Sequence, residues 1–125
     1  MSTNSGPGYK KNFDHRVATR PAGVRVQVTF RGEVMADTRD AVRLDEAGYP
    51  AVYYLPRKDV KMDRLVRTNH QSQCPVKGQA SYYSIKDGPE NAVWSYEQPC
   101  DEVAVIRERL AFYPNKVDSI SAIPD

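Results

Sequence analysis

Three side chains with reactive or charged groups follow one another closely between residues 70 and 77. Cys74 is preceded by His70 and followed by Lys77. A cation close to a thiol favours the thiolate, which is the form of cysteine that acts as a nucleophile or redox sensor. The same residues are also compatible with a buried, inert cysteine that packs as a small apolar side chain. Cys74 and Lys77 are therefore candidate catalytic residues.

A second histidine near the N-terminus adds a candidate general base. His15 and His70 are the two histidines of the chain, and either could act as a general base because imidazole changes its charge close to neutral pH. A single histidine also commonly serves as a hydrogen-bonded structural residue. His15 is therefore the third candidate catalytic residue, with this structural role as its alternative.

Charged and aromatic side chains supply candidates for ligand binding. Arg57 and Asp59 come shortly after Tyr53, while Tyr83 and Trp94 belong to two later apolar segments. Flat rings with a polar tip suit the binding of a planar molecule. The alternatives are a surface ion pair for Arg57 and Asp59, and core packing for the rings.

The cysteines and histidines predict neither a disulfide scaffold nor a metal centre. Cys74 and Cys100 are the two cysteines of the chain, and no Cys-x-x-Cys pair is present. In the sequence Cys-Pro-Val-Lys, a lysine stands where a Cys-Pro-x-Cys redox site has its second thiol, which removes that type of disulfide chemistry. His15 and His70 lack the spacing of metal ligands. We expect no metal and no cofactor.

The composition is that of one globular domain. The chain has 125 residues, of which 40% are hydrophobic and 27% are charged, enough to bury a single core. A net charge of +2 is too small to predict nucleic-acid binding. No apolar run approaches the roughly 18 residues of a membrane helix, and residues 1–8 lack the apolar stretch of a signal peptide. We expect a cytoplasmic protein without a membrane partner.

Basic residues gather in one short segment of this nearly neutral chain. They are Arg57, Lys58, Lys61, Arg64 and Arg67, and they outnumber the two aspartates between them. Such a group is compatible with a solvated surface or with a positive rim that attracts a small anion.

The hydrophobic pattern predicts short strands through most of the chain. Between residues 24 and 30, apolar and polar side chains alternate with the period of two that is typical of a half-buried strand. Glycine- and proline-containing turns, among them Arg31-Gly32, separate the apolar segments. The predicted strands cover residues 24–30, 33–36, 42–45, 51–55, 79–85, 92–96, 111–113 and 116–120.

Three segments are expected to differ from this pattern. The highly charged residues 57–66 predict no more than a single helical turn, and residues 67–78 are polar enough to predict a loop. After Pro99, acidic residues are followed by Val103, Ile106 and Leu110 at helical spacing. This spacing predicts one short helix.

Many short strands with one helix, and no βαβ alternation, favour a mainly β fold. We expect a compact antiparallel sheet assembly, either tent-like or a partly open barrel. Residues 1–12 are expected to form a flexible N-terminal arm, residues 13–120 a single β-rich domain, and residues 121–125 a C-terminal tail.

Several motifs in order along the chain resemble those of the bacterial and fungal domain-of-unknown-function family number 427, which is sometimes labelled nucleotidyltransferase-like. They are Asp14-His15-Arg16-Val17, Val24-Arg25-Val26, Gly32-Glu33-Val34-Met35-Ala36-Asp37, Tyr53-Tyr54-Leu55-Pro56-Arg57-Lys58-Asp59-Val60, Cys74-Pro75-Val76-Lys77-Gly78-Gln79-Ala80-Ser81-Tyr82-Tyr83, Trp94-Ser95-Tyr96-Glu97 and Ala111-Phe112-Tyr113-Pro114-Asn115-Lys116-Val117-Asp118. The resemblance implies a small tent-like β fold, similar to Mss-four-type domains without their zinc cysteines, and no established reaction. The chain has neither paired carboxylates for Mg²⁺ nor a glycine-rich phosphate loop, so the residues do not support nucleotidyl transfer.

Two kinds of function remain open at this point. One is a pocket near the Cys-Pro-x-Lys-Gly loop that binds or acts on a small anionic or planar molecule. It would be walled by tyrosines and Trp94, with Cys74, Lys77, Arg57 and His15 as its polar groups. The other is a non-catalytic module, in which the same loop contacts a protein partner or a second copy of the chain in a homodimer.

Overall fold

The computed structural model describes residues 17–124. The predicted N-terminal arm, residues 1–12, and the candidate base His15 lie outside the described residues. Three antiparallel sheets make up the described chain, and they do not close into a barrel over these residues. The mainly β, antiparallel fold predicted from the hydrophobic pattern is confirmed.

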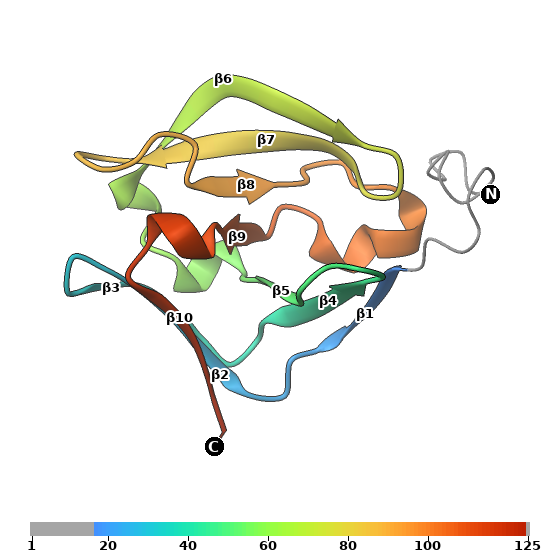
Figure 1. The fold of residues 1–125 in the computed structure, drawn as a ribbon, viewed down its shortest axis with the longest axis horizontal. Helices are drawn as coiled ribbons and strands as arrows, with labels where there is room; N and C mark the ends of the chain where they lie inside the picture. Colours follow the sequence, from blue (N-terminus) through green and yellow to red (C-terminus); the bar gives the residue numbers. More distant parts are fainter. Residues whose placement is uncertain (1–16, 125) are drawn as a thin grey trace.

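The first sheet has the order β10-β2-β3 and lies at the lower left of Figure 1. Strand β2 spans Arg25–Phe30, β3 spans Glu33–Thr38 and β10 spans Ser119–Ile123. Both residues of the predicted Arg31-Gly32 turn have positive φ angles, 50° and 78°. Such a turn matches the natural twist of the strands that it joins. Residues 121–123, predicted as part of the tail, pair with β2.

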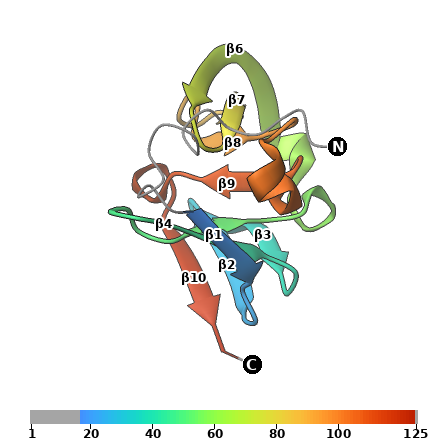
Figure 2. The same ribbon diagram turned by 90° about the vertical axis from the view of Figure 1, so that its right-hand side faces the viewer.

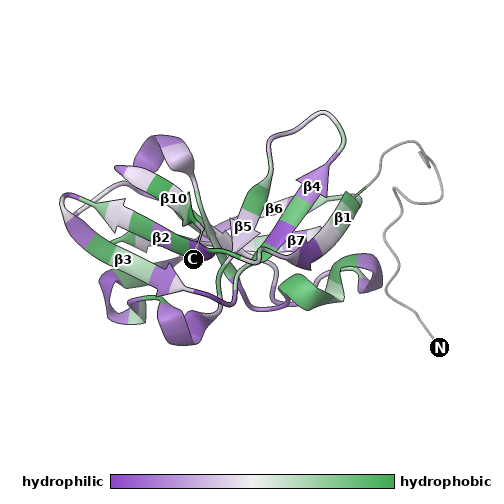
Figure 3. Cartoon of the chain, turned by 90° about the horizontal axis from the view of Figure 1, so that it is seen from below, coloured by the Kyte–Doolittle hydropathy of each residue, from purple (hydrophilic) through white to green (hydrophobic). Residues whose placement is uncertain are grey.

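The second sheet has the order β1-β4-β5, with β1 at Val17–Pro21, β4 at Val42–Glu46 and β5 at Val52–Tyr54. Figure 3 shows hydrophobic and hydrophilic residues alternating along β4. Strand β1 was not predicted, because its sequence carries Thr, Arg and Pro on a largely exposed edge rather than a clear apolar alternation. Its pairing with β4 is what fixes it.

The third sheet has the order β6-β7-β8-β9 and forms the upper layer of Figure 1. Its strands are β6 (Leu65–Cys74), β7 (Gly78–Ile85), β8 (Val93–Ser95) and β9 (Leu110–Phe112). The prediction of a polar loop over residues 67–78 is wrong, because most of that segment is β6. This edge strand exposes most of its side chains and therefore lacks an apolar period. Figure 2 shows it arching over β7.

Short 3₁₀ helices replace longer helical elements. Two of them, η1 (Arg57–Asp59) and η2 (Met62–Arg64), correspond to the predicted turn. The helix predicted after Pro99 is shorter than expected, because η3 covers only Asp101–Ile106 and is broken at Val103. Leu110 belongs to β9 and not to the predicted helical face.

The last predicted strand is displaced along the chain by one more 3₁₀ helix. Residues 116–120 were expected to be extended, but η4 occupies Pro114–Lys116 and the strand β10 begins only at Ser119. The proline at the first helical position supplies the fixed φ angle that a helical turn requires.

Alternate residues of β7 pack into two different core clusters. Tyr83 and Ile85 belong to a first cluster, with Val28, Leu55, Leu110 and other residues of β2, β3, β8 and β9. Ala80 and Tyr82 belong to a second cluster, with Leu44, Tyr54, Tyr96, Val103 and Ile106. Strand side chains point alternately to opposite faces, so one strand can serve both clusters. The third sheet is therefore the layer that joins the two halves of the core.

Backbone hydrogen bonds also tie the second sheet to the third. Leu55 N donates to Leu110 O at 2.8 Å, and Leu110 N donates to Leu55 O at 2.9 Å. Both side chains are buried. No helix of the described chain is long and apolar enough to cross a membrane.

Candidate functional site

The Lys77 side chain is held in a nearly buried ion pair. Its Nζ lies 2.8 Å from Glu46 Oε1, and the two side chains are only 14% and 10% exposed. The same Nζ lies 5.9 Å from the centre of the Tyr96 ring. The ammonium therefore has a carboxylate partner and an aromatic face, and its charge is largely balanced inside the fold.

The two cysteines have different environments. Cys74 ends β6 with partial exposure and packs against the second core cluster, whereas Cys100 is buried. Burial raises the pKa of the Cys100 thiol. Lys77 N donates to Cys74 O, and Cys100 N donates to Lys77 O. These backbone hydrogen bonds hold Cys74, Lys77 and Cys100 close together.

Aromatic rings continue from Lys77 through the second core cluster to the surface. Tyr96 lies 6.4 Å from Tyr54, measured between ring centres, and Tyr54 lies 6.3 Å from Trp94 in an edge-to-face arrangement. Trp94 Nε1 donates to the Tyr54 hydroxyl at 3.3 Å. Trp94 in turn lies 4.4 Å from Tyr113. This aromatic row, Tyr96–Tyr54–Trp94–Tyr113, links the Cys74 turn to the β9 edge of the third sheet.

The phenol groups of this row have raised pKa values, so they stay neutral to a higher pH than usual. Burial raises the pKa of Tyr54, Tyr96 and Tyr113. The Cys74 thiol contributes further to the rise for Tyr54 and Tyr96, so it shares their surroundings. A neutral phenol can both donate and accept a hydrogen bond.

A cavity opens beside the exposed end of the row. Its volume is about 210 Å³. It is lined by Ala51, Val52, Tyr53, Leu55, Trp94, Phe112, Pro114 and Ile120. Two predicted ligand-binding residues, Tyr53 and Trp94, thus come together in the lining of one cavity although they lie far apart in the sequence. We call this the Trp94 cavity.

One cation lies at the Tyr53 side of this cavity. Arg43 faces Tyr53 across the β4–β5 pair, and its guanidinium lies 3.0 Å from Asp45. Hydrogen bonding to Asp45 raises the pKa of Arg43, and an interaction with the Tyr53 hydroxyl adds to the rise. Arg43 was not predicted as a site residue, because nothing in the sequence gives the register between β4 and β5.

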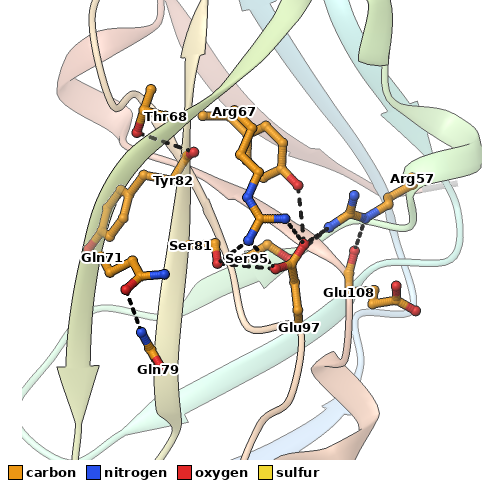
Figure 4. A network of polar contacts seen from close by, with 11 residues as sticks. Arg57, Arg67, Thr68, Gln71, Gln79, Ser81, Tyr82, Ser95, Glu97 and Glu108 are labelled. Atoms are coloured by element: carbon orange, nitrogen blue, oxygen red, sulfur yellow. Dashed lines mark hydrogen bonds and ion pairs between the residues drawn. The ribbon is translucent and has the colours of Figure 1, made fainter.

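Two other predicted residues meet at a separate place. Arg57 lies over the Tyr83 ring, with its guanidinium carbon 5.6 Å from the ring centre. Both side chains approach the carboxylate of Glu97. Figure 4 shows Arg57 beside this carboxylate. Arg67 also binds Glu97 and was not predicted as a site residue. Glu97 lies in the Trp94-Ser95-Tyr96-Glu97 motif, and this motif was the feature of the sequence that could have indicated Glu97 as a site residue.

Asp59 lies apart from both places. Its Oδ2 accepts a hydrogen bond from Thr38 Oγ1 at 2.7 Å. It lines a polar hollow of about 370 Å³ together with Arg25, Asp37, Thr38 and Arg39. The predicted binding residues are thus divided among three locations instead of one pocket.

No group of three or more potential metal ligands occurs within residues 17–124. The side chains gathered around the Trp94 cavity are apolar or aromatic, which suits an organic molecule and not an ion.

The described chain is thus a small antiparallel β protein with an aromatic cavity at a sheet edge. It belongs to the family described as "Domain of unknown function (DUF427)", which matches residues 18–122. The family resemblance that the motifs indicated is confirmed by this match. No curated protein matches the chain.

Proposed function

We propose that the protein binds a small molecule with a planar ring in the Trp94 cavity. The observation that carries this proposal is an apolar cavity of about 210 Å³ with Trp94 and Tyr53 in its lining. A cavity of about 150 Å³ can hold benzene, whereas drug-sized ligands need about 300 Å³ or more. The size therefore suits one ring system, with the remaining part of the ligand outside the cavity.

An anionic substituent on that ring would have a partner at the rim. Arg43 interacts with the Tyr53 hydroxyl, and its pairing with Asp45 leaves it partly exposed, with a side-chain exposure of 34%. A guanidinium matches carboxylate or phosphate oxygens in two parallel hydrogen bonds. The ligand class proposed is therefore a planar ring that carries a negative group.

Binding without a covalent step is the function that the surroundings of Cys74 support best. Lys77 is occupied by Glu46, and the Trp94 cavity does not include Cys74 in its lining. The aromatic row connects the two places only through the buried Tyr54. Catalytic roles for Cys74, Lys77 and His15 stay predictions.

The single tryptophan of the chain makes this proposal directly testable. Trp94 emission is to be followed during titration with three probes: benzoate, benzyl alcohol and cyclohexanecarboxylate. We expect saturable changes with benzoate, weaker binding of the uncharged benzyl alcohol, and none with the non-planar cyclohexanecarboxylate. The Tyr53→Ala variant should lose benzoate binding, because it removes one ring of the cavity wall.

Tyr49→Ala is the matched control, since Tyr49 is 64% exposed and does not line the cavity. It should bind benzoate like the parent chain. Equal responses to benzoate and cyclohexanecarboxylate, or no response to any probe, would refute ring recognition. In that case the predicted interaction module becomes the better hypothesis, and self-association measured by sedimentation would test it.

A further inference from the structure

The Glu97 carboxylate is surrounded by donors from four side chains (Figure 4). Arg67 binds it with both terminal nitrogens: Nη2 lies 2.8 Å from Oε1 and Nη1 lies 3.2 Å from Oε2. Ser81 Oγ lies 3.1 Å from Oε1. Tyr83 Oη and Arg57 Nη2 each lie 3.5 Å from Oε2. Both oxygens of one carboxylate are thus satisfied by a planar fork and by hydroxyl groups.

Three of the donors lie on paired strands and Arg57 lies in η1, whereas the carboxylate lies on a connection. Arg67 of β6 pairs with Tyr83 of β7, and Ser81 pairs with Ser95 of β8. Ser81 and Ser95 are buried, so the side chains beneath the Glu97 carboxylate are polar although the surrounding core is apolar. Glu97 follows β8 and lies outside every strand. Strand pairing therefore positions Arg67, Ser81 and Tyr83, but not Glu97.

The charges at this place do not cancel. Two guanidinium groups, those of Arg57 and Arg67, face one carboxylate among residues 17–124. The remaining contacts of Arg57 are with neutral groups, the Glu108 carbonyl oxygen at 2.6 Å and Ser95 Oγ at 3.3 Å. The side chains of Arg57, Arg67 and Glu97 are 31%, 53% and 28% exposed, so solutes can reach them.

We infer that Arg57, Arg67, Ser81 and Tyr83 form an oxyanion-binding site that Glu97 fills from within. A carboxylate or phosphate group of a small molecule would take the place of the Glu97 carboxylate on the Arg67 fork. Such a tethered occupant competes at a high effective concentration, which lowers the affinity of the parent chain for an outside anion. This site is separate from the Trp94 cavity, because Trp94 and Ser95 point to opposite faces of β8.

Removal of the occupant provides the test. In Glu97→Ala, the site gains a full positive charge and loses its competitor. Calorimetric titration with inorganic phosphate and, separately, with acetate should show binding at least about tenfold tighter than to the parent chain. Combining Glu97→Ala with Arg67→Gln should abolish that gain. Phosphate or acetate alone, or both together, would support the site and identify the preferred oxyanion.

Glu33→Ala is the matched control. Glu33 also lies between two cations, 3.2 Å from Lys61 and 3.5 Å from Arg64. No hydroxyl group or bidentate arginine completes that pair among the contacts of the described chain. Equal gains in Glu33→Ala and Glu97→Ala, or no gain in a folded Glu97→Ala, would overturn the inference. If Glu97→Ala fails to fold, Glu97→Ser also removes the carboxylate from the Arg67 fork while it keeps a polar side chain at this position, and the same outcomes apply.

Discussion

Cys74 and Cys100 are chemically distinct although Cys100 packs against the β6–β7 turn that follows Cys74. Cys100 is 5% exposed and burial raises its thiol pKa, whereas Cys74 is partly exposed. We predict that a thiol reagent at neutral pH labels Cys74 rapidly and Cys100 slowly. Cys74→Ser should remove the rapid phase, because the thiolate is the reactive form and access limits Cys100.

The Lys77→Ala change tests whether the neighbouring ammonium contributes. Lys77 neutralises the Glu46 carboxylate, and Glu46 and Cys74 both lie close to Tyr96. Lys77→Ala leaves that carboxylate uncompensated, and a negative charge disfavours the thiolate, so the rapid phase should slow. Mass spectrometry of each labelled cysteine gives the two rates separately. Equal, slow labelling of both residues would contradict a reactive Cys74.

Asp37 makes the stability of the fold depend on pH in the acidic range. A hydrogen bond from Arg25 Nε, 2.8 Å long, holds the pKa of Asp37 at about 2, below its ordinary value of 3.8. Because the folded-state pKa is lowered, the contribution to stability is present above pH 3.8 and is lost as pH falls towards 2.

The corresponding variant is Asp37→Asn. We predict that the melting temperatures of the parent and the variant differ most at neutral pH and approach each other near pH 2. Subtracting the two pH profiles removes the effects of the other carboxylates. A difference that stays constant down to pH 2 would show that this pair does not titrate with folding.

At the scale of an element, the turn between β6 and β7 depends on Gly78. Its φ is +113°, and a Cβ atom there would lie 3.3 Å from Gln98 O and 3.4 Å from Cys100 N. We predict that Gly78→Ala lowers the free energy of unfolding by about 1–3 kcal/mol, because backbone atoms must move. Urea unfolding measures this loss.

Gly48 provides the matched comparison. It also has a positive φ, +83°, but open space surrounds its missing Cβ. Gly48→Ala should cost only the backbone strain of about 1 kcal/mol. If both variants lost the same stability, close packing of the β6–β7 turn against residues 98–100 would not be a source of stability.

Sequence patterns predicted the elements that have one buried face. Alternation between residues 24 and 30 located β2, and the Arg31-Gly32 turn located the start of β3. The same reasoning failed for β6, because an edge strand pairs by its backbone while both faces meet solvent. It also extended the η3 helix to Leu110, since a buried residue at helical spacing can equally begin a strand.

The candidate sites were less predictable than the strands. Tyr53 and Trp94 could be named from their chemistry, and the structure brings them together. Arg43 and Glu97 could not be ranked, because their roles come from strand register and from the path of the chain after β8. A sequence shows the chemistry of each residue. The distances between residues are set by pairing of strands that are far apart in the sequence.

At the scale of the whole molecule, two core clusters share one sheet. Leu110, fully buried in the first cluster, exchanges backbone hydrogen bonds with Leu55, while Trp94 packs against the second cluster. We predict a single cooperative unfolding transition, with Leu110→Ala lowering stability by about 2–5 kcal/mol. Trp94 fluorescence and far-ultraviolet circular dichroism should shift together, although the substitution lies in the other cluster.

Two separated transitions would contradict this coupling. The coupling would also be contradicted if Leu110→Ala shifted the transition seen by circular dichroism but not the transition seen by Trp94 fluorescence. A surface change such as Val105→Ala, at a residue that is 48% exposed, should leave both transitions close to those of the parent chain.

The Trp94 indole signal in a proton–nitrogen correlation spectrum tests the proposed ligand site most directly. One such signal is expected because the chain has a single tryptophan, and its Nε1 donates to Tyr54 next to the cavity. On titration with benzoate we predict a saturable shift of this signal that is absent with cyclohexanecarboxylate and absent in Tyr53→Ala. An unmoved indole signal, or an identical shift in Tyr53→Ala, would contradict binding of a planar ring in the Trp94 cavity.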